Sequence, residues 1–401
     1  MKDFQNRNNY TTALFVALAC VLQISESLIP HPIPGLRLGL ANILTLTALI
    51  MLGFRAALEI TLMRTILSSF ITGTFMSPGF ILSFSGAVIS TMIMGLLLRL
   101  SDRYPNYGFS LIGISIAGAF THNMVQLCLA YFILIRHSGI FLFFPWLSIG
   151  AVVMGYLVGI TAGGVCRILE NPGEKRGDNF FNSQSQPDIK TQYVPGESFL
   201  YKLSGHNKLL GVIILSLSIL FFTNVLLYLI IFCSLFFAAV LSGVPLSFPF
   251  EKTKRYGFIL LFSLLLPLFF NSGTDSMFAI ANFNVTRGGL TTGVYFSSRI
   301  FILIFMSSLL VRTTSPDEIT KALTSVLYPL KFAGVSPGRI AAILSISWTA
   351  IPVLWETFRH EIYSEGLKNK KDFKGLISSL SRLIATLYLE TEEGGKLWEK
   401  A

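Results

Sequence analysis

Charged residues are scarce in this chain. Asp, Glu, Lys and Arg make up 13% of its 401 residues, whereas 52% are apolar, and the mean hydropathy is +0.65. Residues 104–135 and residues 209–250 contain no charged residue at all. Because a helix needs about 20 apolar residues to cross a bilayer, the second stretch predicts two spans joined by a tight turn at residues 223–224. This composition excludes an ordinary soluble protein and predicts an all-α, polytopic helical membrane protein.

Sequence signals for redox, metal or catalytic chemistry are missing as well. The four cysteines stand singly in apolar segments without a C-x-x-C spacing, so we expect no disulfide framework, no metal site and no cofactor. No phosphate-binding G-x-x-x-x-G-K-[ST], no H-E-x-x-H and no strand-associated G-x-G-x-x-G occurs. No two aspartates are adjacent, which leaves out the paired magnesium site that prenyl diphosphate chemistry would use. We therefore expect that the chain alone is not an enzyme.

The net charge of +10 suggests nucleic acid in a soluble protein, but here the positive-inside rule explains it better. Six spans are predicted in the first half, at residues 11–29, 38–52, 55–72, 79–100, 108–134 and 141–168. With a cytoplasmic N-terminus, eight basic residues of this half lie inside: Lys2, Arg7, Arg55, Arg99, Arg103, Arg167, Lys175 and Arg176. Only Arg37 and Arg136 lie outside. We interpret the first span as retained rather than as a removed signal peptide.

Composition divides the chain into two membrane units. Residues 170–197 are rich in Gly, Pro, Asn, Gln and Ser and carry no helical stripe, which predicts a flexible cytoplasmic linker. Residues 1–169 form the first unit. Residues 198–401 form the second, with spans predicted at 208–223, 225–243, 256–271 and 290–311. Residues 375–389 are a further apolar stretch that the pattern alone does not place.

The stretch that follows the last of these spans reads as a water-facing helix. Ser315, Pro316 and Glu318 form a capping box with proline at the first helical position. Apolar residues then recur at helical spacing and form one stripe: Ile319, Ala322, Leu323, Val326, Leu327 and Leu330. The pattern predicts an amphipathic helix whose apolar side packs on other helices.

Several polar residues fall at membrane depth, where they usually face a cavity or a partner. Seven of them converge near the outer side of the first unit: Glu26, Arg37, Asn42, Arg64, His122, Asn123 and Gln126. An alternative is that they serve as interhelical hydrogen bonds, with a Glu26–Arg37 ion pair. We expect a second pair between Arg55 and Glu59, four residues apart on one helix face. Arg299 lies deep in its span and could pair with a polar group of the first unit.

The sequence GLRLGLANI at residues 35–43 and the sequence SPGFILSFSGA at residues 77–87 resemble the Gx transporter family, which also carries the name heptaprenyl diphosphate synthase component I. The resemblance covers residues 11–168. It implies a six-helix substrate-binding S-component of an energy-coupling factor (ECF) importer, with the seven polar residues as substrate-binding candidates. Three of these are Arg or His, which favours an anionic small molecule. It also implies that Ala13 and Ala17, a small-xxx-small pair, dock this unit onto a T-component, although ordinary internal packing would use the same residues.

The second unit resembles the T-component of the same importers, the CbiQ/EcfT-like subunit, through HNKLLG (206–211), RTTSPDEITKAL (312–323) and YPLKFAGVSPGRIAAILSISWTAIP (328–352). The resemblance implies coupling to two cytoplasmic ATP-binding cassette ATPases in a bacterial cytoplasmic membrane. Ile319, Leu323, Val326 and Leu327 would belong to the coupling surface. The family's Ala-Arg-Gly-like motif has no arginine here, so either Lys368, Lys370 or Lys371 substitutes or the ATPase partner is unusual.

Three functions remain open on the sequence. The first is an importer subunit with S- and T-components fused. The second is a membrane partner in isoprenoid or quinone synthesis, as the family's other name suggests. The third is a redox-associated membrane assembly protein or a secondary carrier. The missing aspartate pairs argue against the second as a self-sufficient enzyme, and the third lacks ligands for haem, iron–sulfur or flavin groups.

Overall fold

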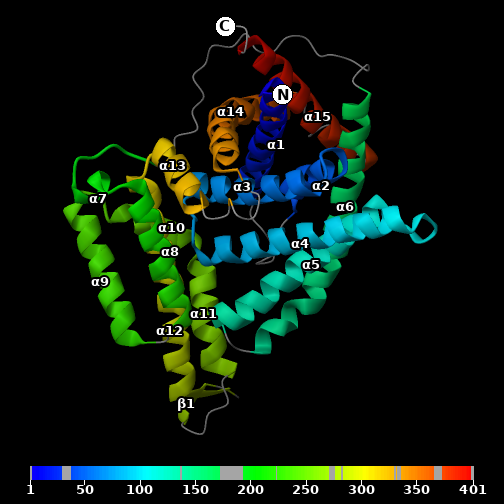
Figure 1. Cartoon of the computed structure of the whole chain (residues 1–401). Coiled ribbons are helices and arrows are strands. Elements are labelled where there is room, and N and C mark those ends of the chain that lie inside the picture. The colour runs from blue at the N-terminus through cyan, green and yellow to red at the C-terminus, as the bar shows by residue number, and fades with distance from the viewer. Residues whose placement is uncertain are drawn as a thin grey trace.

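The computed structural model of the chain describes residues 2–28, 38–135, 138–171, 193–222, 224–270, 276–280, 283–328, 331, 336–364 and 373–398. Almost all of these residues are helical (Figure 1). Within the described ranges, six helical segments are long and apolar enough to cross a membrane: Asn8–Ser27, Pro78–Arg103, Leu111–Ile133, Ser138–Glu170, Arg287–Thr313 and Pro337–His360. The chain is therefore an all-α, multi-pass membrane protein, as its composition predicts.

The first unit contains one helix for each predicted span. These are α1 (Lys2–Leu28), α2 (Leu40–Met51), α3 (Phe54–Thr72), α4 (Pro78–Arg103), α5 (Leu111–Leu129) and α6 (Phe144–Glu170). Short segments join or extend them: η1 (Pro105–Tyr107), the π-helical η2 (Ala130–Ile135) and η3 (Ser138–Phe143). The SPGF sequence has a local function, because the Ser77 side chain accepts a hydrogen bond from the Phe80 amide and Pro78 opens α4.

The second unit follows the predicted order, and short helices, a hairpin and a longer last helix are added to it. Its helices are α7 (Phe199–Lys202), α8 (Gly205–Phe221), α9 (Val225–Leu241), α10 (Ser247–Arg255), α11 (Gly257–Phe270), α12 (Arg287–Thr313), α13 (Pro316–Val326), α14 (Pro337–Ser364) and α15 (Phe373–Trp398). The added short helices are α7 and α10. The hairpin consists of the antiparallel strands β1 (Ser276–Ile280) and β2 (Phe283–Thr286), which the sequence pattern does not predict. The last helix, α15, extends the apolar stretch at 375–389 to 26 residues.

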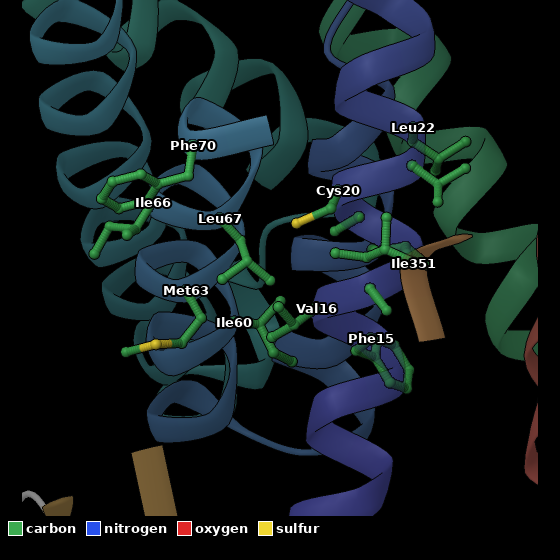
Figure 2. Packing of buried hydrophobic residues seen from close by; sticks show 14 of the residues in the cluster. Phe15, Val16, Cys20, Leu22, Ile60, Met63, Ile66, Leu67, Phe70 and Ile351 are labelled. Atoms are coloured by element: carbon green, nitrogen blue, oxygen red, sulfur yellow. The ribbon is translucent and has the colours of Figure 1, made fainter. Parts of the chain in front are cut away.

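In Figure 1, helix α1 lies between α14 and α15, above α3. It packs against α2 and α3 of its own unit and against α14 and α15 of the other. Every residue from 12 to 22 is buried. Figure 2 shows Val16 and Cys20 of α1 beside Ile60 and Leu67 of α3. One hydrophobic cluster therefore runs through both units, and the first helix is its core.

Helix α13 begins as the sequence predicts, with Ser315 and Glu318 each bonding the other's backbone amide. Its apolar stripe, however, faces the chain's own helices α8 and α14. Ile319, Ala322 and Leu323 are buried there, and Val326 and Leu327 are half-buried. The stripe is thus internal packing of the second unit in this structure.

Helices α5 and α6 approach closely through two glycines that our reading of the sequence missed. A Cβ atom added at Gly155 would lie 2.6 Å from the Cα atom of Ile116, and one added at Gly159 would lie 2.9 Å from the Cα atom of Ile112. These are backbone atoms, so a side chain at either position forces the helices apart. The spacing of four residues is the small-xxx-small pattern of helix contacts in membranes.

We predict that Gly155→Ala lowers the free energy of unfolding by roughly 1–3 kcal/mol, the usual cost of overpacking. Chemical unfolding of the purified protein in detergent measures this change. Gly211→Ala on α8 is the control, because a Cβ atom there meets no heavy atom within 4 Å. Equal stability of the two variants would contradict the close α5–α6 contact.

Candidate binding site and its link to the second unit

Arg64 is the charged centre of the first unit. Its side chain projects from α3 and is 4% exposed. The guanidinium donates hydrogen bonds to three neutral oxygens from the two preceding helices: Gln23 Oε1 at 2.9 Å, Asn42 Oδ1 at 2.7 Å and Thr45 Oγ1 at 3.2 Å. A buried charge is costly unless such partners surround it. Arg64 therefore ties α1, α2 and α3 together around one positive charge.

Glu26 contributes the neighbouring negative charge. Its two carboxylate oxygens accept hydrogen bonds from the backbone amides of Gly39 and Leu40, at 2.9 and 3.1 Å. These amides open α2, where the helix dipole favours an anion. Arg37 lies outside the described residues, so the alternative Glu26–Arg37 pair stays untested. The described role of Glu26 is to fix the start of α2 beside Arg64.

A narrow cavity lies against these groups. About 60 Å³ of it can hold the centre of a water molecule, which is room for a few waters or a small polar group. One wall comes from α1, α2 and α3 and the other from α4, α5 and α6. Of the sequence-predicted residues, the structure brings five to this cavity: Glu26, Asn42, Arg64, His122 and Asn123. The cavity is therefore the candidate binding site.

Gln126 does not line the cavity but supports it. Its side-chain nitrogen lies 3.0 Å from Nε2 of His122, and Asn123 donates to the Leu147 carbonyl at 2.9 Å. His122 fits because the facing residue on α4 is Gly86, where a Cβ atom would lie 3.1 Å from the imidazole ring. Hydrogen bonds within α5 and to the start of α6 thus orient the polar face of α5.

Our reading of the sequence missed the polar residues that complete the wall: Gln23, Thr65, Ser83, Ser90 and Ser115. Gln23 precedes Glu26 by three residues, so their shared helix face was a usable signal. The small hydroxyl residues gave none, because serine and threonine are also ordinary packing residues between membrane helices. Among the described residues, no group of three His, Cys, Asp or Glu side chains could hold a metal ion.

The two units meet first along α1 and α14. The Ser347 hydroxyl donates to the Ala13 carbonyl at 3.0 Å, and Ala13 and Ala17 are fully buried. The C-terminal helix α15 crosses the same region: the Phe15 and Tyr388 rings lie 5.1 Å apart. These contacts place Ala13 at the junction between the units.

A second junction forms around Arg299 of α12, which is 0% exposed. Its guanidinium donates to the Ile133 carbonyl, at the end of the helical segment that continues α5. It also donates to the Tyr228 hydroxyl at 3.1 and 3.2 Å. A cation near a helix C-terminus is electrostatically favourable. Arg299 therefore bonds the first unit, as its depth in the span suggested.

A third link is an ion pair that corrects a sequence prediction. Glu59 does not pair with Arg55, which is exposed, in the described contacts. Its Oε2 atom lies 2.9 Å from Nη2 of Arg339 on α14, and the two side chains are 34% and 28% exposed. The charges face each other without hydrogen-bond alignment. Tertiary packing gave Glu59 a partner on another helix in place of the residue four positions away on its own helix.

The Glu59→Gln and Arg339→Gln changes test this link in a double-mutant cycle. We expect a coupling energy of roughly 0.5–1 kcal/mol, because the pair is partly shielded from solvent. Unfolding in detergent supplies the four free energies. The pair Glu356–Arg359, 3.8 Å apart on the exposed side of α14, is the control and should couple weakly. The interpretation fails if the control couples as strongly as Glu59–Arg339.

Near α13, Lys208 holds the ends of two helices together. Its ammonium donates to the Thr313 carbonyl at 2.7 Å and lies 3.7 Å from the Glu318 carboxylate. The outward face of α13 is formed by Asp317, Lys321 and Ser325. The lysines predicted for coupling, Lys368, Lys370 and Lys371, lie outside the described residues. The position of α13 is therefore set by α8 and α12, while its polar side remains exposed.

Comparison with known proteins divides the chain at the same point. Residues 15–165 match the family described as heptaprenyl diphosphate synthase component I. Residues 196–391 match the family described as cobalt transport protein, CbiQ. The two matches leave the predicted linker between them almost uncovered.

Curated relatives are named energy-coupling factor transporter transmembrane protein EcfT. The protein of Brevibacillus brevis is 35% identical over 165 residues, 41% of this chain and 62% of the relative. The proteins of Streptococcus thermophilus and Bacillus subtilis are 32% and 33% identical over 165 residues, with the same two shares. The chain thus spans about 62% of the length of these relatives.

Proposed function

The chain combines a domain of the heptaprenyl diphosphate synthase component I family with a domain of the cobalt transport protein family, and we propose that it is the membrane subunit of an ECF-type importer. In this proposal the first unit binds a small molecule and the second transmits work from separate cytoplasmic ATPases. The observation that carries the proposal is the buried Arg64 cluster, because it lies in a bundle whose central helix is also the main contact of the second unit.

The substrate that fits the site best is a small anion, such as a vitamin or cofactor precursor with a carboxylate or phosphate. Arg64 is surrounded by neutral oxygens, and Glu26 is occupied by the amides that open α2. An anion that displaces the Gln23 or Asn42 side chain would gain a charge-assisted hydrogen bond from Arg64. The narrow cavity in this structure supports a closed arrangement that opens when such a ligand enters.

The arrangement of the helices supports movement of the whole first unit. In Figure 1, α3 and α4 run across the direction of α9 and α12. If α9 and α12 lie along the membrane normal, α3 and α4 lie near the membrane plane and the cavity does not face the outer side. We therefore propose that the first unit tilts between capture and release, with α1 and α14 as the contact about which it turns.

The proposed coupling surface for the ATPases is the outward side of α13. Ile319 and Leu323 are packed inside the chain, so the exposed residues Asp317, Lys321 and Ser325 would meet the partners instead. Lys208 and the capping box would make this helix rigid enough to transmit movement to α12. Lys368, Lys370 and Lys371 stay candidates for a further contact.

The binding site is tested by the Arg64→Ala change. We first expect purified full-length protein to carry a small anionic compound that mass spectrometry identifies. The variant should bind that compound about ten- to a hundred-fold more weakly, because a hydrogen bond to a charged group is worth roughly 1.5–3 kcal/mol. The control is Arg99→Ala, an exposed arginine beside the Phe54 ring on the same bundle. Unchanged affinity in the Arg64 variant would reduce that residue to a structural role.

The coupling role is tested by co-purification. The tagged chain should bring down two ATP-binding cassette subunits from its native membrane, and Lys321→Glu with Ser325→Glu should reduce their recovery at least ten-fold through a changed charge at the contact. Thr291→Glu, an exposed change near the other end of α12, should leave recovery unchanged. Recovery of an isoprenoid diphosphate synthase subunit in place of ATPases would instead favour the function suggested by the name of the N-terminal family.

A further inference from the structure

An apolar groove of about 680 Å³ lies in the second unit, away from the candidate binding site. Helices α9 and α11 both pack on α12 and leave the groove between them. Its walls include Tyr228 and Phe232 from α9, Leu261 from α11, and Val294 and Phe301 from α12. This volume lies within the range of pockets that bind drug-sized ligands.

Two of the hydroxyl residues that line the groove, Tyr228 and Ser297, already have hydrogen-bond partners inside the chain. The single hydrogen of the Tyr228 hydroxyl is shared between the carbonyl oxygens of Ile219 and Phe222, at 3.1 and 3.0 Å, and the hydroxyl oxygen accepts from Arg299. The Ser297 hydroxyl donates to the Leu260 carbonyl at 3.0 Å. Apart from Tyr295 and Ser298, the other residues that line the groove are apolar or glycine, so the groove favours the hydrocarbon part of a ligand.

Exposed apolar side chains mark the rim. Leu229, Leu261 and Val294 come from three different helices, and about half of each side chain is accessible. Helix α12 is long and apolar enough to cross a membrane, and the shorter apolar helices α9 and α11 pack on it. The groove therefore opens toward the hydrocarbon of the bilayer.

One end of the groove is continuous with a basic segment. Gly257, which lines the groove, follows α10 almost directly, and α10 carries Lys252, Lys254 and Arg255 against the single acid Glu251. Phe250 anchors α10 to the bundle, with its ring 6.0 Å from that of Phe301. A helix with an anchored apolar side and a basic segment lies at a membrane surface and attracts anionic headgroups.

We propose that this groove is a binding site for an anionic phospholipid. One acyl chain lies between α9 and α11, and the phosphate lies beside α10, near the exposed Lys254. A lipid held there would fill the space between α9 and α11 and stabilise their packing on α12. The inference is independent of the importer proposal, because it concerns neither the Arg64 site nor the ATPases.

The test uses the full-length chain in vesicles of phosphatidylglycerol and phosphatidylcholine in equal amounts, followed by native mass spectrometry of the lipids that remain bound. We expect the unmodified chain to retain phosphatidylglycerol over phosphatidylcholine by roughly five-fold for each basic residue that contacts the phosphate. Gly257→Leu should abolish this retention, because a Cβ atom at Gly257 meets no heavy atom within 4 Å and the larger side chain enters the groove.

Two further variants keep the test decisive. Gly211→Leu on α8 also enters open space but lies outside the groove, so it should retain the lipid. Lys254→Gln should keep a bound phospholipid while reducing the preference for phosphatidylglycerol about five-fold. Equal retention of both lipids by the unmodified chain, or identical behaviour of the Gly257 and Gly211 variants, would overturn the proposal. So would a change from dimer to monomer in Gly257→Leu alone, because a second copy would then be the occupant.

Discussion

The enclosure of α1 is the constraint on which the rest of the structure depends. Lipid offers no hydrophobic force to drive helices together, so membrane helices associate through close packing and hydrogen bonds. Ala13, Ala17 and Ala19 are small enough to let neighbours approach, and Ser347 adds a bond to the Ala13 carbonyl. Because α2, α3, α14 and α15 all pack on this one helix, the two units share a single core.

Buried positively charged side chains are the second feature that holds the helices of this protein together. Arg64, Lys208 and Arg299 are each at most 6% exposed, and each donates hydrogen bonds to oxygens from other helices. Each also lies where helices meet: Arg64 inside the binding bundle, Lys208 between α8, α12 and α13, and Arg299 between the units. A long cationic side chain carries several hydrogen-bond donors, so it can bond buried oxygen atoms to which the lipid hydrocarbon offers no donor. Lys208 and Arg299 therefore fix helix ends through backbone carbonyls, whereas Arg64 joins three helices through side-chain oxygens.

These two features connect the candidate site with the second unit. Gln23 and Glu26 of α1 touch the cavity, while Ala13, nearer the N-terminus of the same helix, touches α14. Glu59 of α3 pairs with Arg339 of α14, and Arg64 follows on the same helix by little more than one turn. A shift of α14 relative to the first unit therefore acts on α3, which carries Arg64, and on α1, which carries its partner Gln23. In the proposed function, these contacts would connect the candidate site directly with α14 of the second unit.

The sequence by itself determined the helices and their class. Apolar runs, capping residues and charge placement predicted the six helices of the first unit and the start of α13, because these signals depend on neighbours within one or two turns. The sequence also predicted five of the residues that line the cavity, because polar groups at membrane depth are rare. The β1–β2 hairpin and the serines of the cavity wall gave no comparable signal.

Only the tertiary structure decided which helix faces which. The stripe of α13 could have packed on a partner protein, yet Ile319 and Leu323 lie against α8 and α14 of the same chain. Glu59 had a local partner in Arg55 and took Arg339 instead, and α15 closes over α1 and α6. A helical stripe or a buried charge indicates that a packing partner is needed. Which residue becomes that partner depends on the distance between elements that lie far apart in the chain. That distance is set by the packing of all helices together, which no local pattern contains.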